Sequence, residues 1–151
     1  MITLTQRNSE KTINLENVSV IAIETSKQKV IFNFMNSINK FGRKTPDYAY
    51  LTYETEEDAY NAYNNILEIE FISNEFFISS FNDSIVNKHS INTISIREDK
   101  KLIIFNLNFP VSGDNKSSIS KSVFWSYNTD LDFMEDKKLI LDSIDEKHYI
   151  D

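Results

Sequence analysis

The chain has 151 residues, a net charge of −7 and 40% apolar residues, which is typical of one globular domain with a packed core. The acidic balance argues against a general nucleic-acid-coating protein, because phosphate contacts require clustered Lys and Arg. The chain contains no Cys, so disulfides, thiolate zinc sites and cysteine catalysis are excluded. Its start lacks the pattern of a signal peptide and no long apolar stretch follows, so we expect a cytoplasmic protein.

The first half of the chain reads as three strands followed by a helix. β-rich runs occupy residues 18–23 and 29–35, and residues 48–53 form a third run with two distinct faces. Thr55 is a suitable N-cap for a helix, and the acidic residues after it favour the positive end of the helix dipole. An apolar stripe at helical spacing then follows, formed by Ala59, Ala62, Tyr63, Ile66 and Leu67.

Residues 68–84 connect this half to the next. The segment is rich in Phe and Ile, which excludes a flexible linker. It forms either a helical extension or an extra strand that packs the halves together, and the sequence leaves both open.

The second half repeats the order of strand, strand, strand and helix. Its strands are expected at residues 91–96, 102–109 and 123–127, and Thr129 takes the N-cap position of the helix. The expected apolar stripe of this helix comprises Phe133, Met134, Ile140, Leu141 and Ile144.

The residues repeat as well as the elements. The segment ETSKQKVIFNF, residues 24–34, returns seventy-three positions later as REDKKLIIFNL, residues 97–107. After one inserted residue, YLTYETEEDAYNAYNNIL, residues 50–67, aligns without a gap with FWSYNTDLDFMEDKKLIL, residues 124–141. Amphipathic strands and helices can resemble one another by chance, but here their order repeats too.

We therefore predict an α+β fold built by tandem duplication of a β-β-β-α unit. The sheets are expected to be antiparallel, with the helices packed on one face. The first repeat covers residues 1–74 and the second covers residues 75–151, and the two share a core within one compact domain.

Catalytic patterns are hard to find, and we expect neither an enzyme nor a cofactor. The two histidines, His89 and His148, have no metal-ligand spacing around them. Glycine occurs only at Gly42 and Gly113, so no phosphate-binding glycine loop or nucleophile elbow is present. No metal site is predicted.

Acidic residues at the two helix starts form one candidate binding surface. We single out Glu56, Glu57, Asp130 and Glu135 as an acidic face for a macromolecular partner. The alternative is that these carboxylates only stabilise the helix ends.

The two loops between the second and third strands form another candidate. Residues 36–47 and 110–121 carry local positive charge and can grip a phosphate-bearing ligand, RNA or an acidic patch. Alternatively, they are long surface loops that collect Lys and Ser for solubility. The residues concerned are Lys40, Phe41, Arg43, Lys44, Lys116 and Lys121.

Aromatic side chains on the third strands form the last candidate. If Tyr48, Tyr50 and Phe124 face outward, they make a patch that can stack bases or bury against a protein. The alternative is that residues 68–84 cover this face of the sheet.

These features favour a small acidic, non-enzymatic binding protein. Ile, Asn and Lys are abundant while Ala, Gly, Pro and Arg are scarce, as in AT-rich coding sequences of bacteria and their phages or plasmids. Such a protein looks like a phage-encoded or mobile-element inhibitor of host defence, anti-CRISPR proteins included, that binds a host protein or ribonucleoprotein.

Three other functions remain open. One is a module that sequesters a nucleotide signal at a homo-oligomer interface, and another is a structural assembly subunit. The third is a nucleic-acid-binding module, because in element order alone the duplicated unit resembles single-stranded nucleic-acid-binding folds of the Whirly type. That resemblance implies two related halves that form a β-sheet platform.

Overall fold

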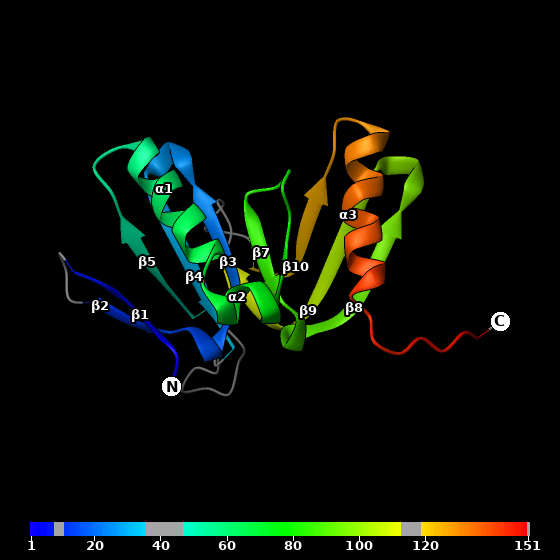
Figure 1. Ribbon diagram of the computed structural model, residues 1–151, viewed down its shortest axis with the longest axis horizontal. Helices are drawn as coiled ribbons and strands as arrows, with labels where there is room; N and C mark the ends of the chain where they lie inside the picture. Colours follow the sequence, from blue (N-terminus) through cyan, green and yellow to red (C-terminus); the bar gives the residue numbers. More distant parts are fainter. Residues whose placement is uncertain (8–10, 36–46, 113–118, 151) are drawn as a thin grey trace.

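A computed structural model gives the structure of residues 1–7, 11–35, 47–112 and 119–150 (Figure 1). Within these ranges the fold is α+β, with three antiparallel sheets and three α-helices. None of the described helices has the length and apolarity needed to cross a membrane.

The larger sheet has five strands in the order β5-β4-β3-β7-β6. Strands β3 and β4 form a hairpin, and β7 pairs with the other edge of β3 although sixty residues separate them. The five strands are β3 (Val18–Glu24), β4 (Lys29–Phe34), β5 (Tyr48–Thr52), β6 (Phe76–Ile78) and β7 (Ser84–Asn87).

The second sheet has three strands in the order β10-β9-β8, with bounds β8 (Ile91–Arg97), β9 (Leu102–Ser112) and β10 (Ile119–Ser126). The third sheet is a single hairpin of β1 (Thr3–Gln6) and β2 (Lys11–Asn14). Short 3-10 turns connect these strands and span Leu15–Asn17 (η1), Thr25–Lys27 (η2), Lys88–Ser90 (η3) and Glu98–Lys100 (η4).

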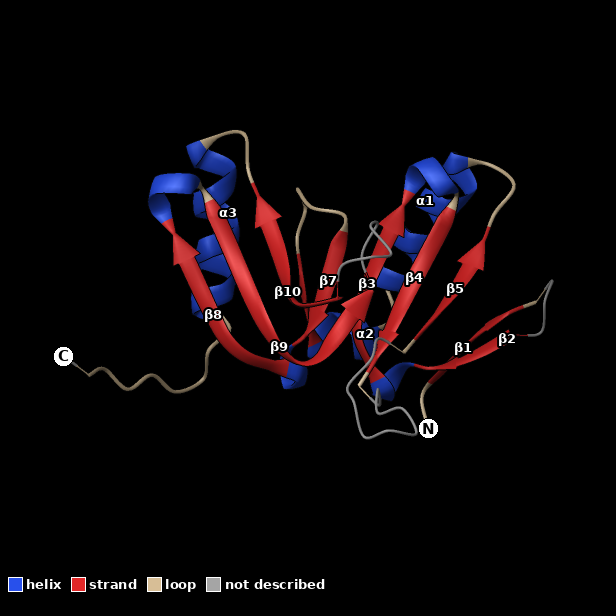
Figure 2. Ribbon diagram, turned by 180° about the vertical axis from the view of Figure 1, so that it is seen from behind, coloured by secondary structure: helices blue, strands red, loops and turns tan. Residues whose placement is uncertain are grey.

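The helices lie on one side of the sheets (Figures 1 and 2). Helix α1 (Glu56–Leu67) covers the five-stranded sheet, and α3 (Asp130–Asp142) covers the three-stranded sheet. The short helix α2 (Glu70–Glu75) follows α1 and leads into β6. Two hydrophobic clusters result, one around Phe32 and Tyr63 and the other around Phe105 and Trp125.

The hairpin of β6 and β7 joins the two clusters. On one face of the hairpin, Phe76 and Ile85 are buried in the first cluster. On the other face, Phe77 and Val86 are buried in the second, where the Phe77 ring stacks on Phe105 at 5.9 Å between centroids. Residues 68–84 therefore supply both a helix and a strand, and they pack the halves together.

The strand registers of the two halves coincide. Val18 opposes Phe34 and Ile91 opposes Leu107, and both strand pairs contain an irregularity at the next position. Among the described residues, each half also has one non-glycine residue with positive φ, Gln28 at 56° and Lys101 at 49°. Both stand at the same place, between a 3-10 turn and the following strand.

Two expectations need correction. Residues 110–121 were expected to form a loop, but β9 continues to Ser112 and β10 begins at Ile119, because the strands keep pairing beyond Asn106. Of the stripe expected for the second helix, Met134 is 54% exposed, and Ile144 lies beyond the end of α3 at Asp142 and is 37% exposed, so neither belongs to the buried stripe. Asp136 is buried there instead, because it has hydrogen-bond partners inside the fold.

Candidate functional site

The acidic ends of α1 and α3 lie at the same edge of the molecule, uppermost in Figure 1. The first turn of α1 contains Glu56 and Glu57, and that of α3 contains Asp130. All three side chains are exposed. The two helix starts thus lie along one edge of the molecule, one on each half, and we call this edge the acidic edge.

Capping shapes both helix starts as the sequence predicts. The Thr55 hydroxyl accepts the Asp58 N–H at 3.0 Å, and the Thr129 hydroxyl accepts the Asp132 N–H at 3.2 Å. These bonds satisfy amides that have no partner within the helix. The threonines therefore have a structural role, while the neighbouring carboxylates remain available at the surface.

Two lysines form ion pairs with carboxylates in and beside α3. Lys101 Nζ lies 3.8 Å from Asp130 Oδ1, and Lys137 pairs with Glu98. Exposed pairs of this kind contribute about 0–1 kcal/mol to stability and are screened by salt. The edge therefore presents mainly negative charge to a partner.

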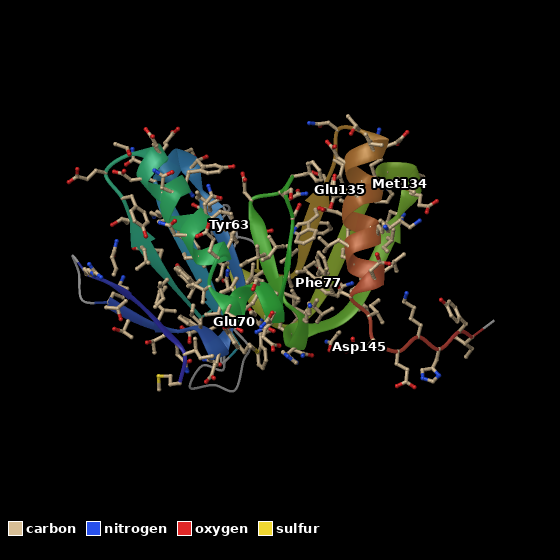
Figure 3. All side chains as sticks on the ribbon, viewed as in Figure 1. Tyr63, Glu70, Phe77, Met134, Glu135 and Asp145 are labelled. Carbon is tan, nitrogen blue, oxygen red and sulfur yellow. The ribbon has the colours of Figure 1, made fainter. Side chains whose placement is uncertain are left out.

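The outer surface of α3 combines exposed apolar side chains with both carboxylates and lysines. Leu131 is 80% exposed and Met134 is 54% exposed, while Phe133 and Ile140 on the inner side are buried. A shallow groove of about 520 Å³ lies along this side of the helix, which carries Met134 and Glu135 (Figure 3). We call this region the α3 outer surface; its residues are Leu131, Met134, Glu135, Lys137, Lys138, Leu141 and Asp142.

The corresponding surface of α1 is more polar. Counted from the capping threonines, Leu131 corresponds to Glu57, Met134 to Tyr60 and Lys138 to Asn64. The Tyr60 hydroxyl donates to Asp83 Oδ1 at 3.4 Å. A helix in this position can therefore fold and pack without apolar residues at the positions of Leu131 and Met134.

The third-strand aromatics are exposed, which the sequence left open, and they do not form one patch. Tyr48, Tyr50 and Phe124 are 45%, 40% and 56% exposed, so residues 68–84 do not cover them. In Figure 2, β4, β3 and β7 lie between β5 and β10, so Phe124 is remote from the two tyrosines.

Two lysines accompany the tyrosines of β5. Lys29 Nζ lies 4.4 Å from the centroid of the Tyr50 ring, and Lys11 Nζ lies 5.5 Å from it. Lys11 also donates to the Tyr50 carbonyl oxygen at 3.0 Å. Tyr48 stacks beside Tyr50 at 6.4 Å between centroids. The result is a small surface of aromatic rings and positive charge on the side away from the helices.

Of the predicted loop residues, one lies within the described part of the chain. Lys121 is exposed in β10. The other five lie outside the described residues, and they are Lys40, Phe41, Arg43, Lys44 and Lys116.

A buried polar cluster was not predicted from the sequence. Asp136 is 1% exposed, and its Oδ2 accepts hydrogen bonds from Ser79 Oγ at 2.6 Å and Tyr127 Oη at 2.7 Å. Burial and the bond to Asp136 raise the pKa of Tyr127. Ser79 Oγ also accepts the N–H groups of Phe81 and Asn82. The cluster ties the turn after β6 to α3 and β10.

One sequence signal could have revealed this cluster. Asp136 stands three residues after Phe133 and four before Ile140, on the buried side of the helix. The corresponding position of the first helix is Ala62. Because Ser79 is itself buried and its hydroxyl is shared among several bonds, the cluster is suited to stabilising the fold rather than to nucleophilic chemistry.

The histidines form separate surface pairs. His89 Nε2 lies 2.6 Å from Glu75 Oε2, and His148 Nε2 lies 2.9 Å from Glu146 Oε1. Among the residues that the structure describes, no group of three or more His, Asp or Glu is placed to hold a metal ion.

The chain matches no protein-family model, no curated protein and no solved structure.

Proposed function

We propose that this is a non-enzymatic binding protein that acts through the α3 outer surface and the adjoining acidic edge. The observation that carries the proposal is the exposure of Leu131 and Met134 beside Asp130 and Glu135. Protein interfaces combine a few apolar anchors with a charged rim. The polar residues at the same positions of α1 support a binding role that is particular to α3.

The partner we propose is a protein or ribonucleoprotein with a basic surface around an apolar depression. The net charge of −7 and the acidic edge favour encounter with such a surface. Nucleic-acid-guided defence enzymes have basic clefts that bind phosphates, and carboxylates can occupy those clefts. In this proposal the protein is a phage or mobile-element inhibitor of host defence, of the anti-CRISPR kind, that works in the host cytoplasm.

We further propose that the two halves arose by tandem duplication and that α3 then acquired its apolar residues. The coincident strand registers, the paired positive-φ residues and the paired capping threonines support a common origin. A copied helix can change on its outer side without loss of stability, because surface substitutions have small effects on folding.

The experiment compares two variants of equal net charge against a panel of purified RNA-guided nucleases. Leu131→Glu gives α3 the residue type that α1 has at Glu57, and Asn64→Glu adds the same charge on α1. We expect wild-type protein to bind and inhibit at least one nuclease. Leu131→Glu should weaken binding by about 30-fold or more, as loss of an interface anchor does, whereas Asn64→Glu should have little effect.

Two results would count against the proposal. Equal binding by both variants would exclude the α3 outer surface as the interface. Absence of binding and inhibition across the panel would reject the assignment to RNA-guided defence.

A second candidate, binding of a nucleotide or single-stranded RNA, is favoured by the surface around Tyr50. Exposed tyrosines can stack on bases while Lys11 and Lys29 attract phosphates. Fluorescence anisotropy with a labelled oligonucleotide separates the candidates. Tyr48→Ala and Lys29→Ala should reduce this binding, while Leu131→Glu should leave it unchanged.

A further inference from the structure

The two sheets differ at one edge. In the five-stranded sheet, β3 has β4 on one side and β7 on the other. Its counterpart in the three-stranded sheet, β8, pairs with β9 and, within the described chain, with no other strand. An unpaired edge of this length offers a row of backbone donors and acceptors to another strand.

A groove lies along the open edge of β8. Its volume is about 810 Å³, and the strand itself contributes Asn92, Thr93 and Ile94 to its lining. Ser143 and Ile144, just after α3, line it as well. Ile94 is only half-buried, whereas its counterpart in β3, Ile21, is fully buried. The groove thus occupies the place that a flanking hairpin fills in the first half.

The β1–β2 hairpin is the counterpart of the β6–β7 hairpin. Leu4 opposes Ile13 in the first, and Phe77 opposes Val86 in the second, at corresponding positions. Leu4 and Ile13 pack into the cluster of the first half. Phe77 and Val86 pack in the same way into the cluster of the second half. Each hairpin therefore rests on its own half through the same face.

The opposite faces of the hairpins have different surroundings. In β6–β7 this face carries Phe76 and Ile85, which are buried against the preceding half. In β1–β2 it carries Thr3, Thr5 and Thr12, which are exposed. Thr5 and Thr12 hydroxyls lie 2.9 Å apart. Threonine fits a pleated surface well, so this face can add to a sheet reversibly.

We propose that the β1–β2 hairpin of one molecule docks on the β8 edge of a second copy, as β6–β7 docks on β3 within the chain. In the known pairing Val20 opposes Val86 and Ile21 opposes Ile85. The same register places Ile13 of one copy opposite Thr93 of the other. It also places Thr12 opposite Ile94.

This contact is head-to-tail, because each molecule offers one hairpin and one open edge. Repetition of a heterologous contact gives a ring if it closes and a filament if it does not. The polar face of β1–β2 and the partly polar groove favour a weak, concentration-dependent assembly. The inference does not depend on the proposed function, since it uses neither the acidic edge nor the α3 outer surface.

The test uses two complementary variants and measures mass by sedimentation velocity over a range of concentrations. Thr12→Lys blocks the hairpin, and Thr93→Lys blocks the edge; both side chains are exposed in the single chain, so the fold should persist. Val20, the counterpart of Thr93, is 3% exposed because the β6–β7 hairpin covers it. If a hairpin docks on β8 in the same way, a lysine at position 93 would have no room in that contact. We expect each variant alone to remain at the 17.6 kDa monomer mass.

A mixture of the two variants should form a 1:1 dimer and nothing larger. The intact hairpin of Thr93→Lys can dock on the intact edge of Thr12→Lys, but no further contact is available. Wild-type protein should form larger species as its concentration rises. A wild type that stays monomeric up to about 1 mM, the weak end of measurable association, overturns the proposal. So does self-association that the mixture of variants fails to reproduce.

Engineered cysteines test the register, since the natural chain contains none. A mixture of Thr12→Cys and Ile94→Cys should form a disulfide-linked dimer on mild oxidation, because opposed strand positions meet the distance requirement. A mixture of Thr12→Cys and Asn64→Cys is the control. Equal cross-linking in both mixtures contradicts the proposed register.

Discussion

Tyr127 and Tyr63 are two buried tyrosines with different hydrogen bonding. The Tyr127 hydroxyl donates to Asp136, which also receives the Ser79 hydroxyl. Tyr63 Oη is buried and has no hydrogen-bond partner among the described residues. Burial raises the pKa of both phenols, and the nearby Asp83 adds to the effect at Tyr63. The same chemical change should therefore have opposite consequences at the two positions.

We predict that Tyr127→Phe lowers the free energy of unfolding by about 1–3 kcal/mol, because Asp136 loses one of its two buried donors. Tyr63→Phe should leave stability unchanged or raise it slightly, because it removes a buried hydroxyl that has no partner. Urea denaturation at neutral pH measures both. Equal losses of stability would show that Tyr63 Oη has an important partner after all.

At the scale of elements, local patterns predicted most of the fold. Thr55 and Thr129 cap their helices as expected, because a cap depends only on residues a few positions away. Strands β3, β4, β5, β8, β9 and β10 were predicted because alternation and β-branched residues are also local signals, whereas β1, β2 and β7 were not predicted and β6 was one of two open alternatives.

Long-range contacts escaped the same reasoning. Nothing near Ile85 or Val86 indicates that β7 pairs with β3, since that pairing depends on how the whole chain packs. Asp136 was missed because its partners, Ser79 and Tyr127, belong to other elements. Met134 was wrongly placed in the buried stripe for a similar reason. Helical spacing shows which residues share a side of the helix, but it does not define how far the contact with the sheet extends. In the candidate sites, the sequence therefore named single carboxylates and tyrosines, but not the apolar residues Leu131 and Met134 on the outer side of α3.

Turns η2 and η4 are each followed by a residue with positive φ, and the prediction for single elements concerns the first of these residues. Gln28 has φ 56° and ψ 42°, a left-handed conformation that costs an L-residue about 1–2 kcal/mol and costs glycine little. Gln28→Gly removes this cost but also gives the unfolded chain more conformational freedom, which partly offsets the gain. The net result should be a free energy of unfolding that is higher by about 0.5–1 kcal/mol.

Ser26→Gly, within the preceding 3-10 turn, is the matched control and should lower stability instead. Thermal denaturation of the two variants provides the comparison. A destabilised Gln28→Gly would mean that the glutamine side chain contributes more than the strain it imposes.

At the scale of the whole molecule, the two halves are joined by the hairpin that they share. Phe76 and Phe77 are adjacent in β6 but are buried in different hydrophobic clusters, because successive strand residues point to opposite faces. Neither half can lose its structure without exposing one face of the hairpin. We therefore expect the chain to unfold as one cooperative unit.

Trp125, the only tryptophan, reports on this coupling from the second half. Leu51→Ala removes a buried side chain from the first cluster and should cost about 2–5 kcal/mol. If the halves are coupled, this variant shifts the fluorescence transition of Trp125 to lower urea concentration by the same amount as the far-ultraviolet circular dichroism transition.

Phe77→Ala, which weakens the contact between the hairpin and Phe105, separates coupling from simple loss of stability. It should cost about 3–5 kcal/mol, and the two transitions should then diverge as the hairpin no longer holds the second cluster to the first. An unshifted Trp125 transition in Leu51→Ala would contradict the coupling, because the second half would then keep its structure after the first had unfolded.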